Sequence, residues 1–366
     1  MSEHSITVAG GESVRLKTAG KYCDRDIIVN AIGGGDAGGG SSEEWIGDGN
    51  THIWITLPEG RTSPMLGVCP KGTVTVDWGD NTEPDILVGE SVTTQVLTPT
   101  HEYTAPGDYI ITLTINGQMG FKGDSSAQGA LCLMHSAESD VRNVVYRNAI
   151  KKIEMGNDIA PMANNAFSNC YNLTRASFSS DLTSTGSYTF NNCYNLTSVN
   201  IPNSVASIGM YGFFNCYSLT NINIPNSVTS IKDKAFYQCD SLTNINIPSS
   251  VTSIGEGAFE GCHGLTSVNI PEKITSIAAS LFSQCDNLTN ISIPNSVISI
   301  GSAAFSKCYG LKFCDFSNHT IVPTMSKANA FNSIPPDCEI RVPAALYDEW
   351  IAATNWSTYA SQIVAV

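Results

Sequence analysis

The chain has 366 residues, a length that allows two or three domains, each with a core of its own. Charged residues make up only 14% of the sequence, against a usual value of about 25%, and the formal net charge is −14. Because phosphate binding needs clustered lysine and arginine, this charge argues against a nucleic-acid partner and against docking on an acidic membrane. No apolar run reaches the roughly 18 residues of a spanning helix, so we expect no membrane insertion, and residues 1–5 show no secretory signal.

Residues 1–32 predict a small N-terminal β module, with short strands over 6–8, 13–16 and 26–29. The segment 16–27, Leu-Lys-Thr-Ala-Gly-Lys-Tyr-Cys-Asp-Arg-Asp-Ile, resembles an N-terminal segment of phage and prophage tail-associated proteins from Gram-positive bacteria. This resemblance implies that the module docks the chain onto other virion or tail proteins. Residues 33–43 follow as a glycine- and serine-rich linker, a composition that predicts a flexible tether.

Residues 44–120 predict a second β domain. The stretch 73–82 alternates apolar and polar residues up to a Gly-Asp-Asn turn, and a second alternating stretch covers 109–115. Together with the His-Glu-Tyr and Pro-Gly motifs between them, these segments resemble a PKD-type β-sandwich. Asn81 stands where that family has glycine, and it suits the turn because asparagine tolerates positive φ. Residues 121–146 are predicted to be a connector.

The sequence then repeats with a constant period over about 147–316, in which equivalent residues stand 23 positions apart. Each unit has a cysteine, at Cys170, Cys193, Cys216, Cys239, Cys262, Cys285 and Cys308. A phenylalanine stands three residues before each cysteine, at Phe167, Phe190, Phe213, Phe236, Phe259, Phe282 and Phe305, and a leucine stands three residues after it. A unit this short cannot bury its apolar residues alone, so neighbouring units must stack into a solenoid with a continuous core.

Within each unit, the L-x-x-V-x-I stretch predicts a short strand with its valine and isoleucine pointing inward, ended by a proline such as Pro202 or Pro225. The phenylalanine and cysteine columns are predicted to fill the opposite wall. Stacked cysteines have parallel Cβ vectors, which fit a disulfide poorly, and one thiol per turn makes no zinc cluster. We therefore predict buried thiols, no metal and no cofactor. The sequence assigns no role to the remaining cysteines, Cys23, Cys69, Cys132, Cys314 and Cys338.

The repeat unit resembles the BspA-like leucine-rich repeats of bacterial surface proteins, and this resemblance implies a curved solenoid used for adhesion. Residues 317–366 resemble the end cap that follows such arrays, with a strand and then a short helix opened by Pro343. Leu346, Trp350 and Ile351 would cover the last turn. The predicted fold is mainly β: a leucine-rich-repeat solenoid preceded by a PKD- or Ig-like β-sandwich and the small N-terminal β module.

Two surfaces of the solenoid are candidate ligand sites. On the outward face of the strands, the predicted binding residues are Asn200, Asn221, Asn223, Asn244, Asn246, Asn269 and Asn290. In the position after the repeat cysteine, Tyr171, Tyr194 and Tyr217 could stack on sugar rings. Neutral amides donate and accept hydrogen bonds without charge, which favours a glycan or an uncharged protein epitope. The alternative is that stacked asparagines only bond one another and stabilise the coil.

The tyrosine column continues with Asp240, His263 and Asp286, which in-register turns place about 4.8 Å apart. A histidine between two carboxylates suits a general base, a metal site or a pH-sensitive patch, and His263 is a candidate binding residue on that account. We favour the plainer interpretation, a solvated corner that tolerates substitution.

The sequence has no G-x-S-x-G, H-E-x-x-H or P-loop motif, and we predict no catalytic residue. The predicted function is adhesion or receptor binding by a phage or prophage tail component that recognises a bacterial surface polysaccharide or protein. Phage fibres are usually trimers, but no heptad or other trimerising stretch is visible in the sequence, so a homotrimer is an open alternative. The alternative is an adhesin on a bacterial cell that binds host protein or extracellular matrix. A polysaccharide depolymerase would need paired carboxylates in a groove, which only the column of Asp240, His263 and Asp286 approaches.

Overall fold

The chain forms two compact units, Met1–Trp45 and Ile46–Val366. A computed structural model describes residues 4–7, 13–16, 46–60, 62–91, 97–121, 133–134, 148–156, 164–178 and 180–366. In the first unit, β1 (His4–Thr7) and β2 (Ser13–Leu16) pair antiparallel, with Ile6 opposite Val14. The third strand expected there, over 26–29, and the linker over 33–43 lie outside the described residues.

The second unit begins with an antiparallel sheet. Its strands are β3 (Thr51–Leu57), β5 (Val68–Asp77), β6 (Asp85–Glu90) and β7 (Gly107–Phe121), in the order β3-β7-β5-β6. A separate short pair joins β4 (Met65–Leu66) to β8 (Leu133–Met134). Asn81 has a φ of 66°, as its place in the turn after β5 requires. Apart from the short pair, the described residues of this region form one sheet, so the second sheet of a PKD-type sandwich is not among them and that resemblance stays a prediction.

The solenoid follows, and each turn opens with a short strand. These first strands are β9 (Ile150–Glu154), β10 (Arg175–Ser177), β11 (Ser198–Asn200), β13 (Asn221–Ile222), β15 (Asn244–Ile245), β17 (Ser267–Val268), β19 (Asn290–Ser292), β21 (Phe313–Asp315) and β23 (Glu339–Val342). Where they pair they run parallel and in register, as Val199 does opposite Ile222. Both side chains point inward and are buried, and Pro202 follows soon after β11 ends.

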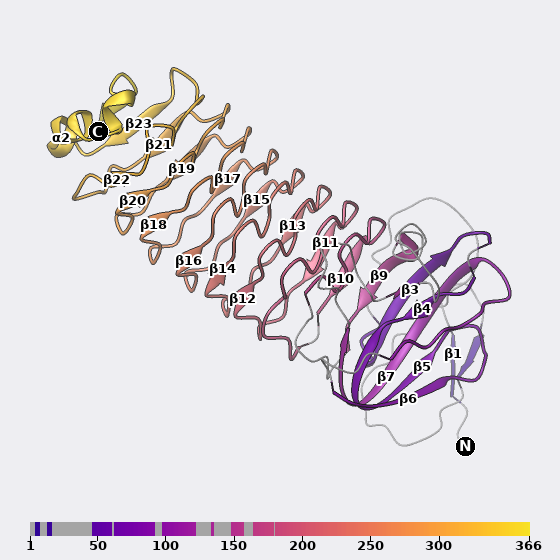
Figure 1. Cartoon of the computed structure of the whole chain (residues 1–366). Helices are drawn as coiled ribbons and strands as arrows, with labels where there is room; N and C mark the ends of the chain where they lie inside the picture. Colours follow the sequence, from indigo (N-terminus) through magenta and orange to yellow (C-terminus); the bar gives the residue numbers. More distant parts are fainter. Residues whose placement is uncertain are drawn as a thin grey trace. The chain divides into compact units, whose positions relative to one another are not determined.

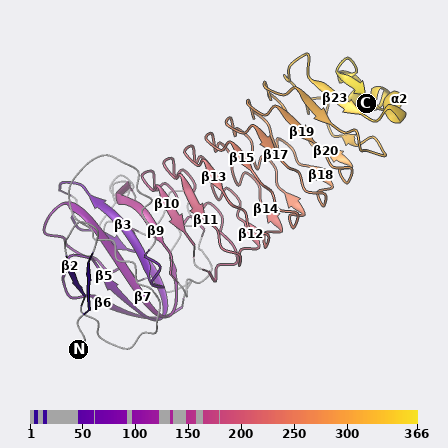
Figure 2. The same cartoon turned by 180° about the vertical axis from the view of Figure 1, so that it is seen from behind.

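From β11 to β21, each turn also has a second short strand, which the sequence did not predict. These are β12 (Ser207–Ile208), β14 (Ser230–Ile231), β16 (Ser253–Ile254), β18 (Ser276–Ile277), β20 (Ser299–Ile300) and β22 (Thr324–Met325). The first and second strands run along different sides of the stack of turns (Figures 1 and 2). A Ser-Ile pair is too short to show the period of two that marks a strand, so only the stacking of turns reveals it.

The return leg of each turn carries the phenylalanine and cysteine columns. The Phe236 ring lies between the rings of Phe213 and Phe259, with centroids 5.3 and 5.5 Å away and nearly parallel planes. The thiol of Cys239 is buried and donates to the carbonyl of Phe213 in the preceding turn, at 3.2 Å. Burial raises the pKa of such thiols, to about 12 for Cys262. Cysteine thus serves here as a small core residue that also satisfies a backbone acceptor.

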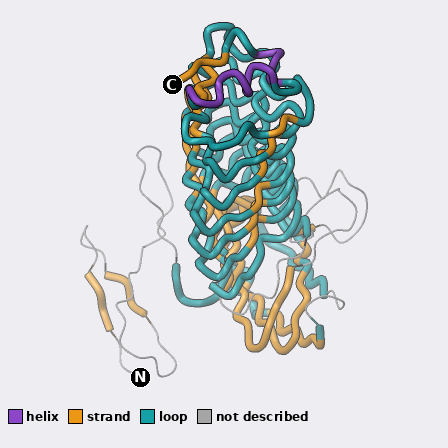
Figure 3. Tube along the Cα trace, turned by 90° about the vertical axis from the view of Figure 1, so that its left-hand side faces the viewer, coloured by secondary structure: helices purple, strands orange, loops and turns teal. Residues whose placement is uncertain are grey.

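The ladder continues beyond residue 316, where the sequence placed the end of the solenoid. β22 and β23 add a further turn, and the Phe331 ring stacks on Phe305 with 5.1 Å between centroids. This turn escapes the repeat pattern because its phenylalanine stands at position 331, later than the period counted from Phe305 would place it. The end is closed by η1 (Ala344–Leu346), α2 (Tyr347–Ala352), η2 (Trp356–Tyr359) and β24 (Ile363–Ala365), the last paired with β23 (Figure 3). Trp350 and Trp356 are fully buried in this cap, and Leu346 and Ile351 pack against its core.

The N-terminal sheet and the solenoid share strands. β9 pairs parallel with β10 and antiparallel with β3, so one sheet runs β13-β11-β10-β9-β3-β7-β5-β6. The carboxylate of Glu154 on β9 accepts hydrogen bonds from the backbone N–H groups of Ile46 and Gly47, at 2.8 and 2.7 Å. The ammonium of Lys152 lies 4.1 Å from the centroid of the Trp54 ring. The antiparallel sheet therefore covers the first turn of the solenoid. No helix in the described ranges is long and apolar enough to cross a membrane.

Candidate functional site

The strand face is the row of outward side chains on the first strands, and it consists of two columns. One column is Arg175, Ser198, Asn221, Asn244, Ser267, Asn290 and Phe313, and the other is Ser177, Asn200, Asn223, Asn246, Asn269, Ser292 and Asp315. Parallel pairing aligns members of a column, as in Arg175 beside Ser198 and Asn290 beside Phe313. The face is therefore neutral in its middle and carries charge toward both ends.

Most of the predicted asparagines on the strand face are open to solvent. Exposed amides that make no hydrogen bond with any described residue belong to Asn200, Asn221, Asn223, Asn244 and Asn246. The amide of Asn269 instead bonds both the N–H and the carbonyl of Ile247, at 2.9 and 2.7 Å. Asn290 donates to the hydroxyl of Thr289 at 3.1 Å. Five of the seven predicted asparagines thus keep a donor and an acceptor free for a ligand.

Asparagines that bond one another lie elsewhere in the coil. The amide of Asn192 donates to Asn169, and that of Asn215 donates to Asn192, both at 2.8 Å. Each of these residues directly precedes a repeat cysteine. The φ angles of Asn169, Asn192 and Asn215 are 62°, 59° and 58°, so their backbones have the left-handed conformation. Stacked asparagine amides therefore stabilise the coil at this turn, before the repeat cysteine. The open amides of the strand face do not bond one another.

The tyrosine column is stacked upon itself. The ring centroids of Tyr171 and Tyr194 are 4.9 Å apart, and those of Tyr194 and Tyr217 are 5.1 Å apart, with interplanar angles of 15° and 24°. Both ring faces of Tyr194 are thus covered, and Tyr171 and Tyr217 each have one face covered by Tyr194. The predicted stacking of a sugar ring is therefore excluded at Tyr194.

The column of Asp240, His263 and Asp286 contains one close pair. His263 Nδ1 lies 2.8 Å from Asp286 Oδ2, and the two side chains are 39% and 38% exposed. Asp240 makes no such bond with His263, and partial burial raises the pKa of its carboxyl while His263 opposes that rise. No group of three His, Cys, Asp or Glu side chains within the described ranges is placed to hold a metal ion. This column thus contains one surface ion pair, between His263 and Asp286, with Asp240 beside it.

We expect His263→Ala to lower the free energy of unfolding by less than about 1 kcal/mol, because ion pairs this exposed are screened by solvent. Binding of the full chain to its target should be the same at about pH 5.5 and pH 7.5 in the wild type and in the variant. Denaturant unfolding and a binding titration at both pH values measure these two effects, with Asp286→Asn as the matched control. A change in affinity at one pH only would show that this corner is a pH-sensitive part of the site.

The sequence matches the BspA type leucine rich repeat region in six copies, over residues 137–220 and 206–334, which together exceed half of the chain. The chain belongs to the BspA-type leucine-rich-repeat family. This match confirms the resemblance shown by the repeat unit, and it also extends past residue 316 into the turn formed by β22 and β23.

Several solved structures resemble this BspA-type chain. The T. pallidum leucine-rich-repeat protein TpLRR is 26% identical, over 52% of this chain and 91% of that one, with a TM-score of 0.40. A leucine-rich-repeat protein from Bacteroides ovatus is 22% identical, over 63% and 70% of the two chains, with a TM-score of 0.42. A leucine-rich cell surface protein from Faecalibacterium prausnitzii is 24% identical, over 53% and 73%, with a TM-score of 0.33. No curated protein matches the chain.

The repeat pattern of this BspA-type chain gives no indication of the C-terminal end of the strand face. There the neutral columns give way to Phe313, Glu339 and Arg341, beside Lys312. The signal for it in the sequence is a longer interval between equivalent residues of the last two turns. The backbone N–H of Lys312 bonds the carbonyl of Thr289, which stands one repeat period earlier. The backbone N–H of Glu339 bonds the carbonyl of Lys312 in the same way, but Glu339 comes four positions later than one period.

Proposed function

We propose that this BspA-type protein is a non-catalytic recognition protein whose strand face binds an uncharged saccharide or protein epitope on a bacterial surface. The observation that carries the proposal is the row of exposed asparagine amides that have no partner in the described part of the chain. An amide offers a donor and an acceptor without charge, as a sugar hydroxyl does. Strand spacing repeats these groups about every 4.8 Å, so neighbouring turns can bind successive groups of one ligand.

Charge supports an uncharged ligand. Residues 170–316 contain six lysines or arginines and eight aspartates or glutamates, so the array is close to neutral. Long-range electrostatic attraction therefore contributes little, and affinity has to come from short-range hydrogen bonds and contacts. A hydrolase acting on saccharides would need two facing carboxylates, and the corner near His263 offers a single paired one.

We further propose that residues 1–32 attach the protein to a phage or prophage tail. Two observations support this role: segment 16–27 resembles tail-associated proteins, and residues 1–45 form a unit of their own. Mass spectrometry of purified virions should then detect the chain in the particle. If it is absent from every particle and is digested by protease added to intact cells, the same strand face belongs to a cell-borne adhesin.

Removing the open amides should abolish most binding. We expect the fourfold variant Asn221→Ala, Asn223→Ala, Asn244→Ala and Asn246→Ala to bind at least about tenfold more weakly. Each lost hydrogen bond contributes roughly 0.5–1.5 kcal/mol, and the losses need not add in full. The measurement is saturation binding of the labelled full chain to a panel of intact Gram-positive bacteria.

The control replaces Asn203 and Asn226, which are exposed in the turns after the first strands and lie off the strand face. It should bind as the wild type does. Wild-type affinity in the fourfold variant would exclude the strand face as the site, and saturable binding to no strain would exclude bacterial surface recognition.

A further inference from the structure

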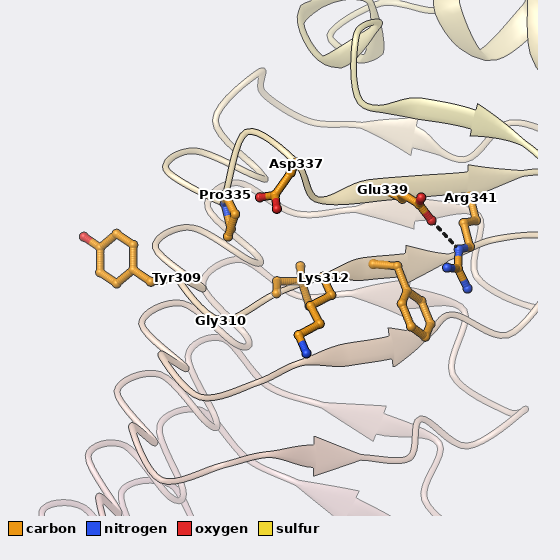
Figure 4. Close-up of a pocket in the computed structure, with 9 residues that line it drawn as sticks. Tyr309, Gly310, Lys312, Pro335, Asp337, Glu339 and Arg341 are labelled. Carbon is orange, nitrogen blue, oxygen red and sulfur yellow. Dashed lines mark hydrogen bonds and ion pairs between the residues drawn. The ribbon is translucent and has the colours of Figure 1, made fainter.

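A shallow hollow of about 650 Å³, open to solvent, lies between the last two turns of the solenoid at the end of the strand face. It is lined by side chains from β21 and β23 and by the loop over 335–337 (Figure 4). The hollow exists because the last turn has extra residues. Glu339 comes four positions later than one repeat period after Lys312, and the additional chain leaves the strand line at Pro335 and Asp337.

A guanidinium is fixed at one end of the hollow. Arg341 Nε donates to Glu339 Oε2 at 2.8 Å, and its guanidinium carbon lies 3.9 Å from the centroid of the Phe313 ring. These contacts hold the planar group in place and leave its two terminal nitrogens without a hydrogen bond to the described residues. A guanidinium fixed in this way loses little entropy when its free N–H groups bind a carboxylate.

Two further groups lie along the hollow. Lys312 is exposed and has no ion pair with a described residue, so its ammonium is free, whereas the guanidinium of Arg341 is paired with Glu339. Tyr309, 58% exposed, lies at the end opposite Arg341, with Lys312 and Asp337 between them (Figure 4). Unlike Tyr194 in the same column, Tyr309 stacks on no other ring in the described part of the chain.

We propose that this hollow binds an acidic oligosaccharide, with a uronate-type carboxylate on Arg341 and Lys312 and a neighbouring pyranose ring on Tyr309. Apolar faces of sugar rings stack on open aromatic rings, and a fixed guanidinium suits a carboxylate. The carboxylate of Asp337 is placed to accept from sugar hydroxyls. This assignment rests on the part of the proposed function that makes the strand face a saccharide-binding surface, and it goes beyond the uncharged ligand proposed there by adding a charge-selective subsite at one end of an otherwise neutral face.

Calorimetric titration of the full chain with three probes tests the assignment. Tri-galacturonate should bind saturably. Its carboxyl-reduced, neutral counterpart should bind at least about tenfold more weakly, since a hydrogen-bonded charge contributes about 10- to 100-fold. Tri-glutamate carries a similar charge without sugar rings and should also bind more weakly. No binding of tri-galacturonate, or equal binding of all three probes, would overturn the assignment.

Variants locate the site. Arg341→Gln, Lys312→Gln and Tyr309→Ala should each weaken tri-galacturonate binding by about tenfold. Matched controls are Arg175→Gln at the other end of the strand face and Tyr194→Ala within the stacked column, and both should bind as the wild type does. Tyr309 and Lys312 are exposed, so their variants should fold and can still test the site if the Arg341→Gln variant does not fold. Wild-type affinity in both the Tyr309 and Lys312 variants would overturn the assignment.

Failure of this inference is distinguishable from failure of the proposed function. Binding to bacteria that is lost in the fourfold asparagine variant, without any uronate binding, would overturn only the hollow as an acidic-sugar subsite. Uronate binding that depends on Arg341, without binding to any bacterial surface, would overturn only the proposed function.

Discussion

Phe236→Ala is expected to lower the free energy of unfolding by about 3–5 kcal/mol, the usual cost of removing a fully buried aromatic ring. Phe236 has no exposed surface and lies between two parallel rings, so the change leaves a cavity with rigid walls above and below. In a solenoid each turn contacts only its neighbours, so the cavity also weakens both interfaces of that turn. Urea unfolding followed by circular dichroism measures the loss.

The matched control is Phe214→Ala. Phe214 is half-buried and stacks on Tyr237 at the surface of the coil, with 4.7 Å between centroids. Its loss should cost about 1 kcal/mol, since much of the vacated space opens to water. Equal costs for the two variants would mean that the phenylalanine column is not the core of the repeat.

The repeat made most of the solenoid predictable from sequence. Because the turns stack, residues that are one period apart in the sequence form a column along the coil. A residue type that recurs once per period therefore contacts the same residue type in the next turn. That reasoning placed the phenylalanines and the buried thiols in columns along the coil, and the structure adds that the phenylalanine rings stack with nearly parallel planes. It also placed His263 next to Asp286.

Other features depend on backbone geometry that the period does not contain. Asn192 and Asn221 belong to the same repeat array, yet one amide bonds its neighbours and the other is open. A positive φ at Asn192 turns its side chain along the column, while the strand at Asn221 directs its side chain outward. The pairing of β3 with β9 joins segments about a hundred residues apart that share no sequence pattern, so the sequence predicts them to be separate domains.

That pairing leads to the second large expected effect. A fragment that begins at residue 147 should self-associate and lose its first turns, because deleting β3 turns β9 into an exposed edge strand. The deletion also removes buried side chains such as Ile53 and Ile55, and each contributes roughly 1.5–3 kcal/mol. We expect a loss on the order of 5 kcal/mol or more, concentrated at that end. Hydrogen exchange should show β9 and β10 unprotected, and light scattering should detect oligomers.

A fragment that begins at residue 46 is the control for that deletion. It keeps β3 and both backbone donors to Glu154, and it lacks only residues 1–45, which form a separate unit. Its midpoint of thermal unfolding should match that of the full chain, and it should stay in the same oligomeric state. If the fragment from residue 147 is equally stable and no more associated, then the antiparallel sheet does not cap the solenoid, and binding experiments can use the repeats alone. If the fragment from residue 147 is less stable and self-associates as expected, the antiparallel sheet belongs to the folding unit of the repeats. Any fragment used to map a ligand on the strand face then has to include that sheet.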